Sequence, residues 1–219
     1  MSTKITYEGI IFMDNNGIIF DLDGTLWDSA EGICGTWRKV IENYPQVKCT
    51  VTVDVLHGCM GLPLDEIGRR LFPELDSDMQ KKLMDECCRL ENEYLAEHGG
   101  MLYPDLEETL EYLSYKYRLF IVSNCQTGYI ESFFKAHGLG KYFDDIECFG
   151  ATGLSKGENN KLIIERNNII SSVYVGDTQG DADSATVAGI PFVYARYGFG
   201  DVEKYDYVID KISDMIKIM

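Results

Sequence analysis

One short stretch near the amino terminus constrains the fold of this chain more than any other. The apolar residues Ile18 to Phe20 follow Gly17 and end abruptly in two carboxylates, Asp21 and Asp23. A short apolar run bounded by turn residues predicts a buried strand, and acids directly after it lie at its carboxyl end. Open α/β sheets bind their ligands at that edge. The stretch therefore predicts an α/β sheet with a charged site where this strand ends.

The spacing of the two carboxylates suits a cation. In an extended chain Asp21 and Asp23 point to one side, whereas Leu22 points to the other. Two like charges on one side repel each other unless a cation or a shared proton relieves them. Gly24 permits a tight turn and a close approach of the backbone to a ligand, and Thr25 follows it. These features indicate a metal-assisted phosphate site, although an acidic surface turn has the same composition.

Composition limits the class of partner. The chain has 219 residues, enough for one large domain or for a core with a smaller insertion. Its formal net charge of −16 repels nucleic-acid phosphates, so we expect no nucleic-acid partner. The 7 cysteines form no C-x-x-C pair, and there is no signal-peptide pattern or long apolar run. We therefore expect a cytoplasmic protein with reduced thiols and no membrane contact, either monomer or homodimer.

From about residue 99 the sequence alternates between apolar runs and helical patterns. The strands predicted after the first lie at 119–122, 146–149, 173–175, 192–194 and 207–209. The helices predicted between them lie at 105–115, 128–137, 157–167 and 181–188. Such alternation predicts an α/β fold: a Rossmann-like parallel sheet with helices on both faces.

Residues 30–98 interrupt this pattern because they carry helical stripes and no convincing strand. We expect an all-helical cap domain here, inserted into an α/β core domain of residues 1–29 and 99–219. Its first helix would take Asp28-Ser29 as N-cap, and a capping box from Ser77 to Gln80 would open its longest helix. Residues 1–14 could form a strand with a hairpin turn at 14–17, or precede a true start at Met13.

Two further segments of the sequence carry groups that can bind phosphate. Ser123 and Asn124 end a predicted strand, where a hydroxyl and a backbone N–H can donate to phosphate oxygens. A capping box at 155–158 places Lys156 in a first helical turn, whose free N–H groups already favour an anion. Lys161, one turn later, is the second candidate. A plain strand-ending serine and a solvated lysine are the structural alternatives.

In a last segment, a predicted strand is again followed directly by acidic residues. The strand 173–175 runs into Gly176 and Asp177, and Asp181 follows four residues on. Carboxylate oxygens suit Mg²⁺ better than a soft transition metal. A chance acidic turn is the alternative.

Taken in sequence order, these four segments resemble the four motifs of the haloacid dehalogenase superfamily, in its phosphoglycolate phosphatase-like branch. The first motif is Asp-Leu-Asp-Gly-Thr-Leu at 21–26, and the last is Gly-Asp-Thr-Gln-Gly-Asp at 176–181. The insert resembles a C1-type cap, and residues 197–200 resemble a late segment of that branch. Lys156-Gly157 stands where many relatives have Lys-Pro, which is a departure from the family pattern.

The resemblance implies roles for the residues of each segment. Asp21 would be the nucleophile and Asp23 the general acid and base. Mg²⁺ would bind Asp21, the backbone carbonyl of Asp23 and Asp177, with support from Asp181. The residues implied to contact the phosphate are Gly24, Thr25, Ser123, Asn124 and Lys156.

These roles predict hydrolysis of a small phosphorylated metabolite, a phosphomonoester, through an aspartyl-phosphate intermediate that requires Mg²⁺. A phosphosugar mutase similar to β-phosphoglucomutase uses the same groups and remains an alternative. A phospho-acceptor signalling domain is a third possibility, but it needs neither Asp23 nor a large insert. Phosphonoacetaldehyde hydrolysis would require a Schiff-base lysine from the cap, where Lys39 and Lys48 have no supporting motif.

The irregular segment 57–63 is the candidate for substrate selection. It resembles the Gly-Leu-Pro substrate loop of capped relatives, and loops often carry specificity. We therefore assign specificity to Met60, Gly61 and Leu62, with a simple connector as the alternative. Arg69 and Arg70 follow this loop and are candidates for contact with a second anionic group.

Overall fold

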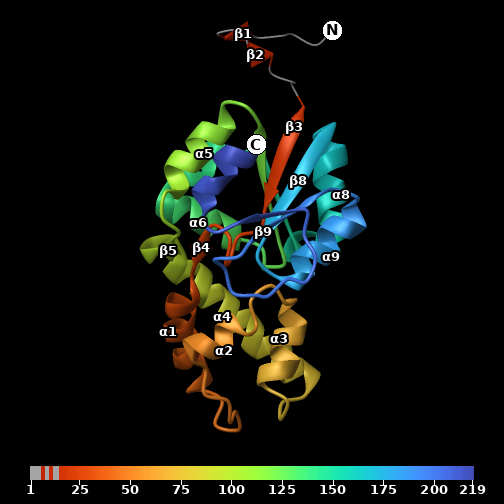
Figure 1. The fold of residues 1–219 in the computed structure, drawn as a ribbon. Coiled ribbons are helices and arrows are strands. Elements are labelled where there is room, and N and C mark those ends of the chain that lie inside the picture. The colour runs from red at the N-terminus through yellow and green to blue at the C-terminus, as the bar shows by residue number, and fades with distance from the viewer. Residues whose placement is uncertain (1–5, 8–9, 12–14) are drawn as a thin grey trace.

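The computed structural model describes residues 6–7, 10–11 and 15–219. Near the amino terminus, β1 (Thr6–Tyr7) and β2 (Ile10–Ile11) form an antiparallel pair (Figure 1). The rest of the strand predicted over residues 1–14 lies outside the described residues, as does Asp14 of the expected hairpin turn. Gly17 is not in a turn, because it belongs to the first strand of the main sheet.

A six-stranded sheet forms the centre of the molecule, in the order β10-β9-β8-β3-β6-β7. Its strands are β3 (Asn16–Phe20), β6 (Arg118–Ser123), β7 (Asp145–Cys148), β8 (Ser171–Gly176), β9 (Phe192–Ala195) and β10 (Tyr207–Ile209). All neighbours run parallel. Phe20, the last residue of β3, aligns with Ile121 of β6 and Val175 of β8. The carboxyl ends of these three strands therefore meet at one edge.

Helices cover both faces of this sheet, which explains the continuous apolar run of β3. Ile18 and Phe20 pack on one face with residues of α5 (Leu106–Ser114) and α6 (Tyr129–His137). Ile19 packs on the other face with residues of α8 (Lys156–Arg166) and α9 (Gln179–Ala188). The shorter helical segments are η1 (Leu139–Tyr142), α7 (Phe149–Thr152), η2 (Ile212–Asp214) and α10 (Met215–Ile218). The predicted Rossmann-like α/β fold is confirmed.

Residues 30–98 contain helices alone. These are α1 (Ala30–Ile41), α2 (Val53–His57), α3 (Leu64–Leu71) and α4 (Ser77–His98). They lie beyond the carboxyl ends of the sheet strands (Figure 1). The two connections to the sheet pair with each other, as β4 (Trp27–Asp28) and β5 (Met101–Leu102) form a small antiparallel ladder. The sequence did not predict this ladder.

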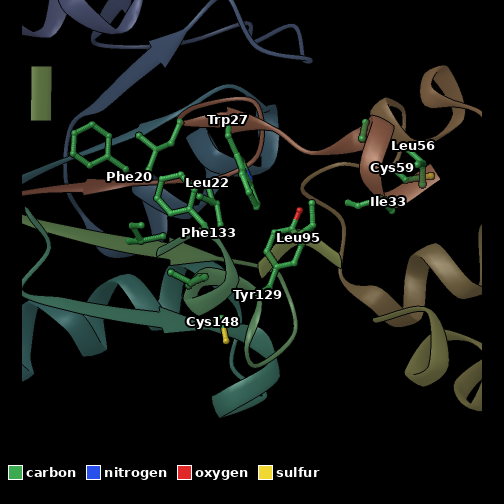
Figure 2. Close-up of a cluster of buried hydrophobic side chains, with 14 of the residues drawn as sticks. Phe20, Leu22, Trp27, Ile33, Leu56, Cys59, Leu95, Tyr129, Phe133 and Cys148 are labelled. Carbon is green, nitrogen blue, oxygen red and sulfur yellow. The ribbon is translucent and has the colours of Figure 1, made fainter. Parts of the chain in front are cut away.

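One cluster of buried apolar side chains runs from the sheet into the insertion. It joins Phe20 and Leu22 through Trp27 to Ile33 and Leu56 of the helices (Figure 2). Trp27 is fully buried and makes an edge contact with the ring of Tyr129, with ring centroids 5.7 Å apart. This apolar continuity holds the inserted helices against the site edge of the sheet.

Two predicted helix starts are wrong in detail. Asp76, not Ser77, caps α4, because its carboxylate accepts the N–H of Met79 at 2.9 Å. The Gln80 amide instead donates to the carbonyl of Phe72 at 2.9 Å. At α1 the Ser29 hydroxyl makes no cap, since it donates to a carboxylate of the site described below.

Candidate active site

Three carboxylates meet where β3 and β8 end. Asp21 follows β3, Asp177 follows β8, and Asp181 lies in the first turn of α9. One oxygen from each lies within 4.8 Å of the others. All three side chains are buried, with Asp21 2% exposed and the other two fully enclosed. The sequence placed Asp21 and Asp177 at strand ends, and the parallel register brings them together with Asp181.

Lys156 provides a positive charge at this cluster. Its Nζ lies 3.1 Å from Oδ1 of Asp21 and 2.7 Å from Oδ1 of Asp181. It is the first residue of α8, where Ser155 and Glu158 form the predicted capping box. Lys161, the second candidate, is exposed. Burial opposes the charge on Lys156, but Asp181 and Asp21 raise its pKa above the ordinary value.

Negative charge remains in excess, and this fits a divalent cation. Burial raises the pKa of Asp21 to about 7, with a further contribution from Asp181. Burial also raises the pKa of Asp177 well above its ordinary value. Oδ1 of Asp21 is a buried oxygen that no described residue reaches with a hydrogen bond, because the Lys156 contact is not aligned as one. An orphaned oxygen beside other carboxylates is a suitable donor set for a hard divalent cation.

Both carboxylate oxygens of Asp181 accept hydrogen bonds from other residues. Oδ2 accepts hydrogen bonds from the backbone and hydroxyl of Thr178 at 2.9 and 2.7 Å and from the Asp177 N–H at 3.2 Å. Oδ1 accepts from Lys156 at 2.7 Å. Asp181 therefore holds the loop that carries Asp177 and also positions the lysine.

Asp23 faces the cavity next to Asp21, as the alternation of an extended chain predicted. Its Oδ1 accepts hydrogen bonds from the Ser29 hydroxyl at 2.7 Å and the Tyr129 hydroxyl at 2.8 Å. Burial raises the pKa of Asp23, and the two hydrogen bonds oppose that rise. Neither hydrogen bond was predicted from the sequence. Tyr129 begins α6, distant in sequence, and no motif marked it.

The turn after Asp23 packs against Asp177. Gly24 has a φ of +79°, and a Cβ there would lie 2.2 Å from Oδ2 of Asp177. Thr25 is fully buried, and its hydroxyl donates to Oδ1 of Asp177 at 3.5 Å. The N–H of Phe199 donates to Oδ2 at 2.7 Å. Gly24 and Thr25, expected to contact phosphate, are thus close-packed around one carboxylate.

A cavity of about 60 Å³ lies between the sheet edge and the inserted helices. Asp21, Asp23 and Ser123 line it on the sheet side. Met60, Gly61 and Leu62, the predicted specificity residues, line it on the helical side, with Asn124 between the two. The carboxylates of the sheet edge and the loop 57–63 therefore face one cavity.

The loop 57–63 contacts the core directly. The side-chain amide of Asn124 donates to the carbonyl of Gly61 at 2.8 Å. This amide, expected to meet phosphate, therefore joins the loop to the sheet edge. The His57 ring stacks on Phe199 at 4.4 Å between centroids and pairs with Asp28 at 3.0 Å.

The arginines and lysines of the insertion that were considered for substrate contact lie outside the cavity. Arg69 pairs with Asp65 at the surface at 2.8 Å, and Arg70 donates to the carbonyl of Gly58 at 2.9 Å. Lys39 and Lys48 are exposed. None of these four lines the cavity.

Carboxylates at the strand ends of a parallel α/β sheet, with a lysine from the first turn of α8 beside them, form a site suited to phosphate chemistry. The sequence matches the family of haloacid dehalogenase-like hydrolases over residues 18–195, and the chain belongs to that family. This confirms the resemblance and the prediction of an enzyme. Among the described residues no helix has the length and apolar character needed to cross a membrane.

Individual relatives cover nearly the whole chain. It is 27% identical to the phosphoglycolate phosphatase of Vibrio parahaemolyticus, over 92% of this chain and 95% of the relative. It is also 27% identical to the phosphoglycolate phosphatase of Escherichia coli K12, over 94% and 92%. A haloacid dehalogenase-like hydrolase from Bacteroides fragilis superposes with a TM-score of 0.79 at 27% identity, over 91% of this chain and 98% of that one.

Proposed function

We propose that this protein is a Mg²⁺-dependent phosphatase that hydrolyses a small phosphomonoester through an aspartyl-phosphate on Asp21. The observation that carries the proposal is the buried Asp21 carboxylate, which lines the cavity and has the Lys156 ammonium 3.1 Å from its Oδ1. The phosphoglycolate phosphatases that align over more than nine-tenths of the chain support the same reaction class.

The metal would be held by Asp21, Asp177 and the backbone carbonyl of Asp23. The orphaned oxygen of Asp21 and the surplus of buried carboxylates support this assignment. When bound, Mg²⁺ supplies positive charge that offsets the charge of the phosphate oxygens. Lys156 adds a fixed positive charge 3.1 Å from Oδ1 of Asp21, and Ser123, which also lines the cavity, would offer a hydroxyl to a phosphate oxygen.

Two steps follow from the positions of the two aspartates. In the first, a carboxylate oxygen of Asp21 bonds to phosphorus, the bond to the leaving alcohol breaks, and Asp23 gives its proton to the departing alkoxide. In the second, Asp23 takes a proton from the water that attacks phosphorus, and inorganic phosphate leaves as the Asp21 carboxylate is restored. Ser29 and Tyr129 keep Asp23 oriented for both transfers.

Residues 30–98 would act as a cap over this chemistry, with the core formed by 1–29 and 99–219. The segments that cross between them, β4 and β5, are the proposed hinge. Contacts between Asn124 and Gly61 and between His57 and Phe199 support a closed arrangement in which the loop covers the cavity. Closure would keep bulk water away from the aspartyl-phosphate.

The test is release of inorganic phosphate from p-nitrophenyl phosphate and from a panel of phosphorylated metabolites, with Mg²⁺ and after its removal by a chelator. We expect phosphate release that is lost with the metal and restored by adding it back. Conversion of a sugar phosphate to its isomer without phosphate release would show a mutase instead. A long-lived phosphoprotein without turnover would show a phospho-acceptor domain.

A further inference from the structure

The cavity beside Asp21 and Asp23 is apolar on the side where a leaving group would lie. The inserted helices contribute Ile33, Leu56, Leu64 and Ile67 to this wall. Within the described part of the chain, no lysine, arginine or histidine lines the cavity. A substrate bound there with its phosphate at Asp21 would therefore meet no positive charge at its other end.

Among the described residues, Glu91 of α4 is the one acid that the inserted helices bring to this wall. It is 3% exposed, and each of its oxygens accepts one N–H, from the Trp37 indole and from the Gln126 amide. Gln126 also donates to Oδ1 of Asn92 at 2.8 Å, which fixes the amide. The carboxyl group is thus held from α1 and from the loop after β6. Each carboxylate oxygen can accept two hydrogen bonds, so capacity remains for a donor that enters the cavity.

The surroundings of Glu91 disfavour an anion whatever its protonation state. Burial raises the pKa of Glu91 to about 8, so it is neutral or negative near neutral pH and never positive. Lys156 is engaged by Asp21 and Asp181, and Arg69 and Arg70 lie outside the cavity. A carboxylate that entered this apolar space would lose its hydration and find no cation to replace it.

We propose that the leaving alcohol of the substrate is uncharged or cationic, with an apolar body and a terminal hydroxyl or ammonium that donates a hydrogen bond to Glu91. Phosphate esters that end in a carboxylate are then poor substrates of this protein. Phosphoglycolate is one of them, although the relatives reported above are phosphoglycolate phosphatases. This inference rests on the proposed phosphatase activity and deepens it by naming the substrate class.

The test compares matched phosphate monoesters. Straight-chain esters of about two to four carbon atoms, ending in a methyl, hydroxyl, ammonium or carboxylate group, are assayed for kcat/KM with Mg²⁺, including phosphoglycolate. At each length we expect the carboxylate ester to be slower than the hydroxyl and ammonium esters by about tenfold or more. Equal rates, or a preference for the carboxylate, would overturn the inference.

Two kinds of variant test the contribution of Glu91 to selectivity separately from that of the apolar wall. Glu91→Gln removes the acid and keeps its shape, so the ratio of ammonium to carboxylate turnover should fall. Met60→Lys brings a cation to the cavity, and relative to its matched neutral variant Met60→Gln it should raise turnover of the carboxylate esters selectively. Unchanged ratios in both comparisons would contradict the assignment, and the Met60 pair stays informative if Glu91→Gln does not fold.

Failure of the inference differs from failure of the proposed function. If no ester and no p-nitrophenyl phosphate releases phosphate, the phosphatase proposal itself is wrong. If p-nitrophenyl phosphate is turned over and the carboxylate esters are the best of the series, the reaction stands and the substrate class is wrong.

Discussion

Nζ of Lys156 lies 3.1 Å from Oδ1 of Asp21, and both side chains are buried at the edge of the sheet. The lysine reaches this position because it is the first residue of α8, and Asp181 holds its ammonium at 2.7 Å. A positive charge fixed beside a carboxylate suits a phosphate that arrives between them, as the proposed role of Asp21 as nucleophile requires.

The first prediction concerns this lysine. Lys156→Ala should lower kcat/KM on p-nitrophenyl phosphate by about 10²–10³, as for loss of a charge-stabilising donor in a transition state. Lys161→Ala, an exposed lysine one turn along the same helix, is the matched control and should stay near wild type. A damaging Lys161 variant with a mild Lys156 variant would show that the lysine is assigned wrongly.

The second prediction concerns the close packing of Gly24 on Asp177. Gly24→Ala should destabilise the fold and abolish most activity, because a Cβ would lie 2.2 Å from the carboxylate at a φ of +79°. Gly189→Ala is the control, since its φ is +73° but nothing lies within 4 Å of the added carbon. A positive φ alone costs a non-glycine residue about 1–2 kcal/mol, and both variants carry this cost. Thermal unfolding should therefore show a clearly larger loss of stability for Gly24→Ala than for Gly189→Ala. Equal losses would contradict the packing argument.

The third prediction concerns the loop of the insertion. Met60 and Leu62 line the cavity, and Gly61 is held by Asn124 at 2.8 Å. Met60→Ala and Leu62→Ala should change the ranking of kcat/KM across several metabolites while sparing small aryl phosphates. If every substrate is scaled by one common factor, the loop does not select the substrate.

The fourth prediction follows from the buried acid of α4. Burial raises the pKa of Glu91 from 4.5 to about 8 in the folded protein. Between these values the unfolded chain loses a proton that the folded protein keeps, so the free energy of unfolding falls as pH rises through this window. Glu91→Gln should remove about 1–4 kcal/mol of that fall between pH ~4.5 and ~8.

The control for this measurement is Glu93→Gln, an exposed glutamate on the same helix that pairs with Arg89. Chemical denaturation across the pH range should show the wild-type slope in the control and a shallower one in Glu91→Gln. Parallel curves for wild type and Glu91→Gln would mean that Glu91 titrates near its ordinary pKa.

The sequence sufficed for the sheet and for the groups at its edge. Strand ends are marked locally, by apolar runs that stop in Asp21, Ser123 and Asp177, and parallel pairing then brings these ends together without further information. The capping box before Lys156 is likewise local. Such features need only the chain within a few residues.

Contacts made across the molecule were not predictable in this way. Tyr129 reaches Asp23 only because α6 packs on Trp27, and nothing in the local sequence marks that meeting. Glu91 lies on a long helix among many acids, and only packing buries it. Ser29 reads as an N-cap but serves Asp23, because a tertiary partner competes with the helix end for its hydroxyl.

The most direct test of the proposed mechanism is the turnover of p-nitrophenyl phosphate by Asp21→Asn with Mg²⁺, compared with Asp183→Asn, an exposed aspartate of α9. Asn keeps the shape of the side chain but is a far weaker nucleophile. We predict that kcat/KM falls by about 10³ or more in Asp21→Asn and stays near wild type in the control. Near-normal turnover by Asp21→Asn would contradict the proposed mechanism.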